Sequence, residues 1–177
     1  PYYLQDGNPA AFAIRAILAA TMSPSWGMYS GYELCEHEPL PGREEYDHSE
    51  KYEYRPRDYS GEPNLSVLIT RLNEIRREHP ALQQLRDVTI HNAPDDRILV
   101  FSKKSGSDVV IVAVSLDPVW GASSQVMLDM AALGLDSDAQ FDVHDELTGA
   151  DFTWSQQAWV NLYPAQSAHI LTVRGSH

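Results

Sequence analysis

The sequence predicts an α/β segment followed by an all-β, antiparallel β-sandwich. Before Leu85, apolar residues recur at helical spacing on either side of one aromatic run punctuated by glycine. Beyond Leu85 they alternate with polar residues in about eight short runs, a spacing typical of a sandwich. We therefore divide the chain into residues 1–84, an α/β remnant, residues 85–173, the sandwich, and residues 174–177, which look like the start of an engineered histidine tag.

The first predicted helix spans Ala10 to Met22, which is rich in Ala, Ile and Leu and contains one charge. Such a helix is expected to be buried on most of its circumference. Ser23-Pro24 ends it, and the aromatic run from Trp26 to Tyr32 is consistent with a buried strand that ends near a cleft. Because a parallel strand normally needs the rest of its sheet, this first part is not expected to fold alone.

Residues 33–62 predict a long irregular excursion, because they are polar, acidic and interrupted by prolines. Loops of this length are usually functional or disordered. A second helix is expected from Leu65 to Glu78, with Asn64 as its cap. It should end by His79-Pro80, since the residue before proline is biased out of the helical region.

Eight strands are predicted in the remainder of the chain. Turn signals such as Ala93-Pro94-Asp95-Asp96 separate them. A unit of roughly 90 residues is large enough to fold independently. The predicted strands are Val88 to Asn92, Arg97 to Lys103, Asp108 to Leu116, Gln125 to Met130, Gln140 to Asp145, Phe152 to Trp154, Ala158 to Tyr163 and Ser167 to Val173.

The composition is that of a soluble globular protein, with 43% hydrophobic and 21% charged residues. The net charge of −12 argues against nucleic acid as a partner, because phosphate binding needs clustered Lys and Arg. The longest apolar stretch, Pro9 to Met22, is too short to cross a bilayer.

A lone cysteine, Cys35, favours a cytoplasmic location. Pro1 looks like a cut made inside a longer chain.

Neither a metal nor a cofactor is expected. The seven histidines show no ligand spacing, and no glycine-rich phosphate loop or nucleophile elbow is present. Carboxylates are plentiful between Glu33 and Glu53, but a given loop acid is far more often solvated surface than a catalyst. A retaining glycosidase needs two carboxyl groups about 5 to 5.5 Å apart, and abundance alone does not identify such a pair.

Two groups of side chains in and beside the excursion are candidates for sugar binding. Aromatic faces suit sugar rings, although core packing is an equal alternative. Cationic donors could hold sugar hydroxyls or an anionic leaving group, although a surface ion-pair cluster is equally expected. The aromatic group is Trp26, Tyr29, Tyr32, Tyr46, Tyr52, Tyr54 and Tyr59, and the second group is Lys51, Arg55, Arg57 and Asp58.

Three blocks of sequence, Ala19 to Leu34, Tyr46 to Tyr52 and Arg55 to Asp58, resemble one family. It is the alpha-1,4-glucan:maltose-1-phosphate maltosyltransferases of glycoside hydrolase family thirteen, in the alpha-amylase superfamily. Gly27 to Glu33 looks like the last barrel strand and loop found across that superfamily, whereas the later blocks look more particular to the maltosyltransferases. Beyond Val88 the chain is similar only in pattern to the family's C-terminal β-sandwich.

The resemblance implies that residues 1–84 are the end of a catalytic (β/α)8 barrel, with Trp26 to Tyr32 as its eighth strand. The family transfers maltosyl units from maltose 1-phosphate to the non-reducing end of alpha-glucans, with retention, in glycogen and alpha-glucan biosynthesis by bacteria. Its two catalytic aspartates and its glutamate would lie upstream of Pro1, so this chain alone is expected to be inactive. Lys51 and Tyr52 match residues that contact the donor sugar.

The implied partners are alpha-glucan, maltose 1-phosphate and the rest of the barrel, with dimerisation left open and with neither nucleic acid nor a membrane involved. Two alternatives remain. The parent could be a hydrolase of the alpha-amylase type, since Lys51 separates transferase from hydrolase only softly. Residues 85–173 could instead be a stand-alone carbohydrate-binding or stabilising β-module.

Overall fold

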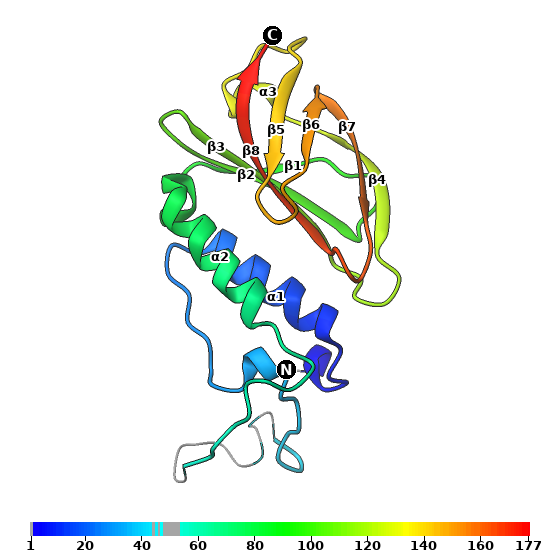
Figure 1. Ribbon diagram of the computed structural model, residues 1–177. Helices are drawn as coiled ribbons and strands as arrows, with labels where there is room; N and C mark the ends of the chain where they lie inside the picture. The colour runs from blue at the N-terminus through cyan, green and yellow to red at the C-terminus, as the bar shows by residue number, and fades with distance from the viewer. Residues whose placement is uncertain (1, 44, 46, 48–53) are drawn as a thin grey trace.

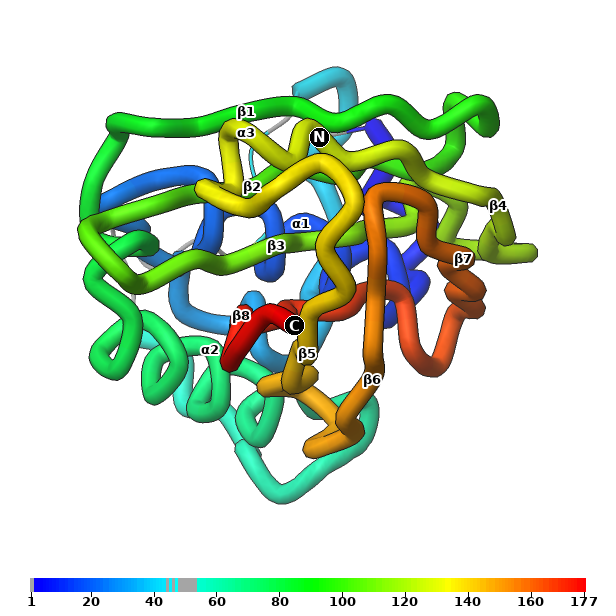
Figure 2. The backbone as a smooth tube through the Cα atoms, turned by 90° about the horizontal axis from the view of Figure 1, so that it is seen from above, coloured from blue at the N-terminus to red at the C-terminus, as the bar shows by residue number. Residues whose placement is uncertain are grey.

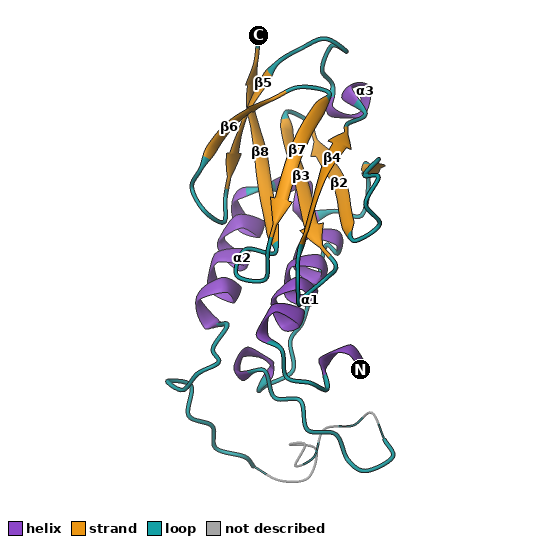
Figure 3. Cartoon of the chain, turned by 90° about the vertical axis from the view of Figure 1, so that its right-hand side faces the viewer, coloured by secondary structure: helices purple, strands orange, loops and turns teal. Residues whose placement is uncertain are grey.

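The computed structural model describes residues 2–43, 45, 47 and 54–177, and these form three layers (Figures 1 and 3). Two helices, α1 (Pro9–Met22) and α2 (Ser66–Glu78), form the first layer. A six-stranded antiparallel sheet with the strand order β1-β2-β3-β8-β5-β6 forms the second, and the pair β4-β7 forms the third. No helix in the described part of the chain is long and apolar enough to span a membrane.

Both long helices begin and end where the sequence predicts, within a residue or two. Asn8 caps α1, since its side-chain oxygen accepts the N–H of Ala10 at 2.9 Å, and the N–H of Ser66 donates to Asn64 Oδ1 at 2.8 Å where α2 begins. The last carbonyls of α1 are capped from α2. Arg76 donates to the carbonyl oxygens of Ala20, Ser23 and Pro24, which otherwise lack a partner within the helix.

The strand predicted at Trp26 to Tyr32 is wrong. Residues 26–29 have no regular structure, a turn follows, and Tyr32–Leu34 form a 3₁₀ helix, η2. A strand must exchange backbone hydrogen bonds with a neighbour, and no described strand lies alongside this segment. An eighth barrel strand is therefore not present here, and the barrel origin of residues 1–84 stays a prediction.

All eight predicted strands of the second part are present and antiparallel, in agreement with a β-sandwich. The fourth lies earlier than predicted, because residues 130–133 form a short helix, α3, capped by Asp129 and ended by Gly134 in the left-handed region. The bounds are β1 Val88–His91, β2 Ile98–Ser105, β3 Asp108–Ser115, β4 Ala122–Met127, β5 Phe141–Asp145, β6 Asp151–Trp154, β7 Gln157–Leu162 and β8 Ala168–Ser176.

The six-stranded sheet has a hydrophobic core on each face. Val100 and Ile111 point toward the β4-β7 pair, where they pack with Val126 and Val160. Side chains on the opposite face of the sheet pack under α1 and α2: Phe101, Val110, Val112, Val114 and Ile170 form one cluster with Ile14, Ile17, Leu72 and Ile75. A single core therefore crosses residue 85, and the boundary predicted there remains a prediction.

Candidate functional site

Arg57 and Glu36 form the buried polar centre of the excursion. Arg57 Nε lies 2.9 Å from Glu36 Oε1 and Arg57 Nη2 lies 3.2 Å from Glu36 Oε2, so that the guanidinium and the carboxylate meet through two parallel bonds. Only 3% of the Arg57 side chain is exposed. A two-point pair of this kind fixes both partners in direction as well as distance. It therefore joins residues 55–58 to the segment that follows η2.

The chain reverses next to this pair at Gly31, whose φ is +96°. A Cβ built there would lie 2.1 Å from Glu36 Oε2, so only glycine fits both the conformation and the space. Ser30 Oγ accepts a hydrogen bond from Arg57 Nη1 at 3.0 Å and lies 3.3 Å from Tyr59 Oη. The structure thus gathers a guanidinium, a carboxylate, a serine hydroxyl and a phenol in one place.

A cavity of about 230 Å³ lies directly beside Glu36. Arg55 reaches over it, with Nη1 3.7 Å from Glu36 Oε2 and 40% of its side chain exposed. Its wall combines carboxylates, a guanidinium and an imidazole, groups that bind hydroxyls and anions through charge-assisted hydrogen bonds. The lining residues are Leu34, Cys35, Glu36, His37, Glu38, Asp47 and Arg55.

The predicted sugar-binding aromatics separate into two kinds. Trp26 and Tyr32 are packing residues: Trp26 Nε1 donates to Asn73 Oδ1 at 3.2 Å, and Tyr32 Oη donates to the Phe12 carbonyl at 2.6 Å. Tyr29 and Tyr59 are each 47% exposed and lie with the Arg57 cluster, whereas Tyr54 is 87% exposed. Among the predicted aromatics that the structure describes, Tyr29 and Tyr59 thus combine an accessible ring with the polar groups around Arg57.

Lys51 and Tyr52, the predicted donor-sugar contacts, lie outside the described residues, as does Tyr46. Asp58 is described and has a local role. Its Oδ1 accepts the N–H and the hydroxyl of Ser60, and these hydrogen bonds hold the pKa of Asp58 below its usual 3.8. Asp58 therefore shapes a turn. Cys35 is buried, and burial raises the pKa of its thiol to about 11, so the thiol is not a nucleophile at neutral pH.

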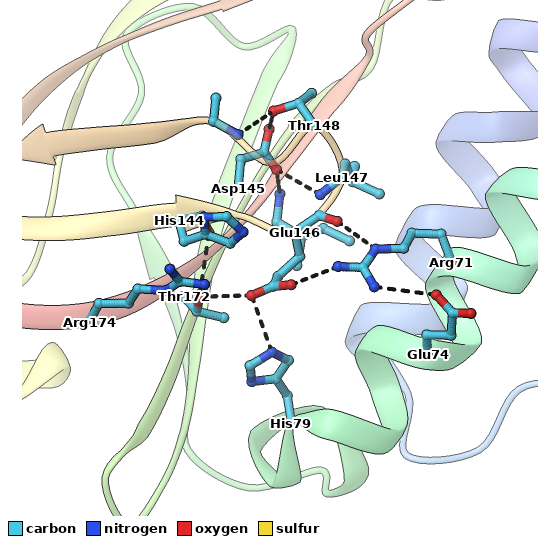
Figure 4. A network of polar contacts seen from close by, with 12 residues as sticks. Arg71, Glu74, His79, His144, Asp145, Glu146, Leu147, Thr148, Thr172 and Arg174 are labelled. Carbon is cyan, nitrogen blue, oxygen red and sulfur yellow. Dashed lines mark hydrogen bonds and ion pairs between the residues drawn. The ribbon is translucent and has the colours of Figure 1, made fainter.

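A second polar network fastens α2 to the sandwich (Figure 4). Arg71 of α2 donates from Nη2 to Glu146 Oε2 at 2.8 Å and from Nε to the Glu146 carbonyl at 2.7 Å. Glu146 Oε1 accepts the Thr172 hydroxyl at 3.0 Å. Behind it, Asp145 is fully buried. Burial alone would raise the pKa of Asp145, but hydrogen bonds from His169, Thr148 and the Leu147 N–H outweigh it and hold the pKa below 3.8.

Within the described residues, one group could offer ligand atoms to a metal ion: Glu78, His79 and Glu146, whose candidate atoms lie within 4.8 Å of one another. Two of these side chains, His79 and Glu146, already have partners in the network. His79 Nδ1 lies 2.9 Å from Asp108 Oδ1, and Glu146 is held by Arg71. We therefore assign the group to the joint between α2 and the sheet. The spacing of the seven histidines in the sequence gave no sign of it.

A cavity of about 580 Å³ lies between the helices and the loop that leads into β8. Ala13 and Ile17 line it from α1, Leu68 and Arg71 from α2, and the segment 164–168 from the sandwich. Its wall is mainly apolar. It has one guanidinium and no pair of carboxylates, so it does not offer the acid and nucleophile of a glycoside-cleaving site.

Several solved structures with a similar fold are alpha-amylases. The alpha-amylase of Geobacillus thermoleovorans, solved with acarbose, matches 95% of this chain and 34% of its own at a TM-score of 0.65 and 13% identity. A maltogenic alpha-amylase from Thermotoga neapolitana matches 93% of this chain and 36% of its own at a TM-score of 0.63 and 11% identity. At such low identity these matches define the fold class alone.

Sequence comparison finds more similar relatives. Residues 90–173 match the family model described as "GLGE, C-terminal". The chain is 49% identical to alpha-1,4-glucan:maltose-1-phosphate maltosyltransferase 2 of Streptomyces coelicolor over 97% of its length, and 50% identical to the maltosyltransferase of Corynebacterium glutamicum over 96%. It spans 27% and 26% of those proteins. The resemblance to the maltosyltransferases is therefore confirmed, for a chain about a quarter of their length.

Proposed function

We propose that the whole protein to which this chain corresponds is a retaining maltosyltransferase. It transfers maltosyl units from maltose 1-phosphate to the non-reducing end of an alpha-1,4-glucan and releases inorganic phosphate. The observation that supports this most directly is the identity of 47–50% over 96–97% of the chain to proteins named for that activity in three bacterial genera. The matched length includes the excursion as well as the sandwich.

The chain itself would supply a wall of the donor pocket and the β-sandwich that packs against the catalytic barrel. The paired carboxylates of the reaction would lie in the remainder of the protein, together with most of the barrel. Among the described acids, Glu36 lines a cavity and is held by two arginines. A carboxylate held in this way is suited to positioning rather than to attack on a sugar. A cytoplasmic location belongs to the same proposal.

The decisive experiment compares the 177-residue chain with the whole protein. Each is incubated with maltose 1-phosphate and maltoheptaose, and phosphate release and chain elongation are followed together. Elongation in steps of two glucosyl units by the whole protein alone supports the proposal. Activity in the short chain would mean that its own carboxylates are catalytic, and a whole protein that ignores maltose 1-phosphate would remove the assignment.

Lys51 and Tyr52 are the residues proposed to contact the donor sugar. In the whole protein, Lys51→Ala should reduce transfer from maltose 1-phosphate by about tenfold, the loss expected for one charge-assisted hydrogen bond. Lys104→Ala, in strand β2, is the matched control and should leave transfer unchanged. Equal kinetics for the two variants would remove Lys51 from the donor site.

An alpha-amylase-type hydrolase is the second candidate, because the structures that share this fold are named as amylases. The same assay separates the two reactions. A hydrolase would release new reducing ends from maltoheptaose in the absence of maltose 1-phosphate, whereas a maltosyltransferase would lengthen the oligosaccharide only when the phosphate donor is present.

A further inference from the structure

The outer face of the β4-β7 pair displays an accessible tryptophan in a neutral surrounding. Trp159 lies in the middle of β7 and is 67% exposed, while its strand neighbours Ala158 and Val160 point into the core. In the antiparallel register Trp159 is opposite Gln125. A large indole left in water costs free energy unless something covers it. This residue is therefore the first candidate for a binding contact outside the excursion.

Amide and hydroxyl groups surround Trp159 on that face. The amide nitrogen of Gln125 donates to Gln157 Oε1 at 3.2 Å, and the hydroxyl of Ser123 donates to Asn161 Oδ1. These four side chains belong to the same outward-facing rows as Trp159. None of them is ionisable, in a chain with a net charge of −12. The ring is thus framed by hydrogen-bonding groups without charge.

A hollow of about 340 Å³ opens beside Trp159, between β6 and β7. The two strands lie next to each other at one side of the molecule (Figures 1 and 2). Phe152 and Thr153 line the hollow from β6, Ser155 from the connecting turn, and Gln157 and Trp159 from β7. Phe152 is 37% exposed and packs edge-on against His169, with ring centroids 5.8 Å apart. Two accessible aromatic rings therefore border one concave, uncharged space.

The hollow also lies between two strand edges. Strand β6 is the last strand of the large sheet, and β7 pairs only with β4. Each therefore presents backbone N–H and C=O groups on its outer edge that no neighbouring strand uses within the described structure. Such groups can donate to and accept from a ligand with many hydroxyls.

The chemistry of this site fits an uncharged, hydroxyl-rich chain. Sugar rings stack their C–H faces on aromatic rings, and amides and hydroxyls bind their equatorial hydroxyl groups. A polyanion would be disfavoured by the net charge of the chain, and a cationic peptide would find no carboxylate among the lining residues. Neutral polysaccharide is therefore the occupant that charge favours.

We propose that Trp159 and the hollow between β6 and β7 form a second alpha-glucan binding site, which holds part of the polymer on the sandwich. The ligand class rests on the function proposed above. Trp159 is the stacking platform, Phe152 forms the opposite wall, and Gln157 supplies hydrogen bonds between them.

The test uses the full 177-residue chain and isothermal titration with maltoheptaose, with cellohexaose as the β-linked control. Saturable binding of maltoheptaose is expected. Trp159→Ala should weaken it about tenfold, the loss of roughly one aromatic contact, and Gln157→Ala about threefold. Trp120→Ala is the matched control, because Trp120 is 81% exposed and does not line the hollow. It should bind as the parent chain does.

Unchanged binding in Trp159→Ala, or no binding of maltoheptaose by the parent chain, would overturn the proposal. Far-ultraviolet circular dichroism of each variant checks that a loss of binding is not a loss of fold. In the whole protein, protection of Trp159 from acrylamide quenching in the absence of glucan would show that another segment covers this face, which also overturns the proposal. Because this titration needs no maltose 1-phosphate, its result is independent of the transfer assay.

Discussion

The excursion and the sandwich reach order by different means. In the sandwich, alternating side chains bury both faces of a sheet whose neighbouring strands are paired along their lengths. In the described part of residues 23–65, backbone pairing is sparse. Long-range ion pairs and side-chain hydrogen bonds contribute more there, chiefly those of Arg57 with Glu36 and of Arg76 with the end of α1. The difference teaches that a repeated local pattern organises the sandwich, whereas single distant contacts organise the excursion.

Removal of the helices should have the largest effect on this comparison. A chain of residues 85–177 would expose the sheet face formed by Phe101, Val110, Val112, Val114 and Ile170. Burial of five such side chains contributes on the order of 10 kcal/mol, comparable with the whole stability of a domain. We expect loss of the cooperative urea transition seen for the full chain. A transition with the same midpoint in both chains would mean that the sandwich is self-sufficient.

Loss of the buried Asp145 carboxylate should have the second largest effect on stability. Asp145→Ala should lower the free energy of unfolding by about 3 kcal/mol, because it leaves His169 and three further donors without their acceptor. The pKa of Asp145 is depressed in the folded state, so its contribution is present above pH 3.8 and is lost as the pH falls through the lower folded-state pKa.

The test of Asp145 compares denaturant unfolding at pH 7 and at pH 3. Asp142→Ala is the control, since Asp142 is exposed. Within the described structure, its side chain accepts one hydrogen bond, from the Thr153 hydroxyl. It should cost less than about 0.5 kcal/mol. A loss for Asp145→Ala that is no greater than that of the control would contradict the role of the buried carboxylate.

The ion pair of Arg57 with Glu36 tests how the excursion is held together. Arg57→Ala should lower the free energy needed to open residues 30–36 locally by about 2 kcal/mol, because it leaves a partly buried Glu36 without its two-point partner. Hydrogen exchange of that segment measures the opening, and the urea midpoint of the sandwich should not move. The control is Arg55→Ala, whose more exposed side chain is 3.7 Å from the same carboxylate. Equal exchange in both variants would show that the two-point pair does not organise the segment.

Lys103 should give the smallest effect, and one of opposite sign. Its side chain is fully buried on β2, and among the described residues its Nζ has no hydrogen-bond partner. Burial, together with the nearby Arg76, lowers the pKa of Lys103 from 10.5. Lys103→Met should therefore stabilise the chain by about 1 kcal/mol at neutral pH, because it replaces an unpaired buried charge with an apolar side chain of similar size.

The gain from Lys103→Met should shrink as the pH rises from the lowered folded-state pKa toward 10.5, since the parent lysine then loses its charge in the folded state first. Urea unfolding at pH 7 and at pH 10 measures it. Lys104→Met, which changes a less buried lysine on the same strand, should have little effect. A destabilised Lys103→Met variant would show that the ammonium has a favourable partner.

Much of the fold could be predicted because its cause is local. Alternation predicted all eight strands of the sandwich, with the fourth displaced along the chain. Asn64 marked the start of α2, and Ser23-Pro24 and His79-Pro80 marked helix ends. The motifs from Ala19 to Asp58 also led to the maltosyltransferases, a resemblance that the comparison confirmed. The cavity beside Glu36 was not predicted, because the sequence distinguishes Glu36 from the other loop acids by nothing but position.

The sequence by itself thus determined the class of the second half, the two long helices and the resemblance to the maltosyltransferases, since these follow from periodicity, capping and shared motifs. The tertiary structure alone decided that Trp26 to Tyr32 is not a strand, that Arg57 meets Glu36, and that Arg71 meets Glu146 across 75 residues. Each of these depends on which distant group supplies a hydrogen-bond partner. Local spacing does not contain that information, because the partners come together only when the layers pack.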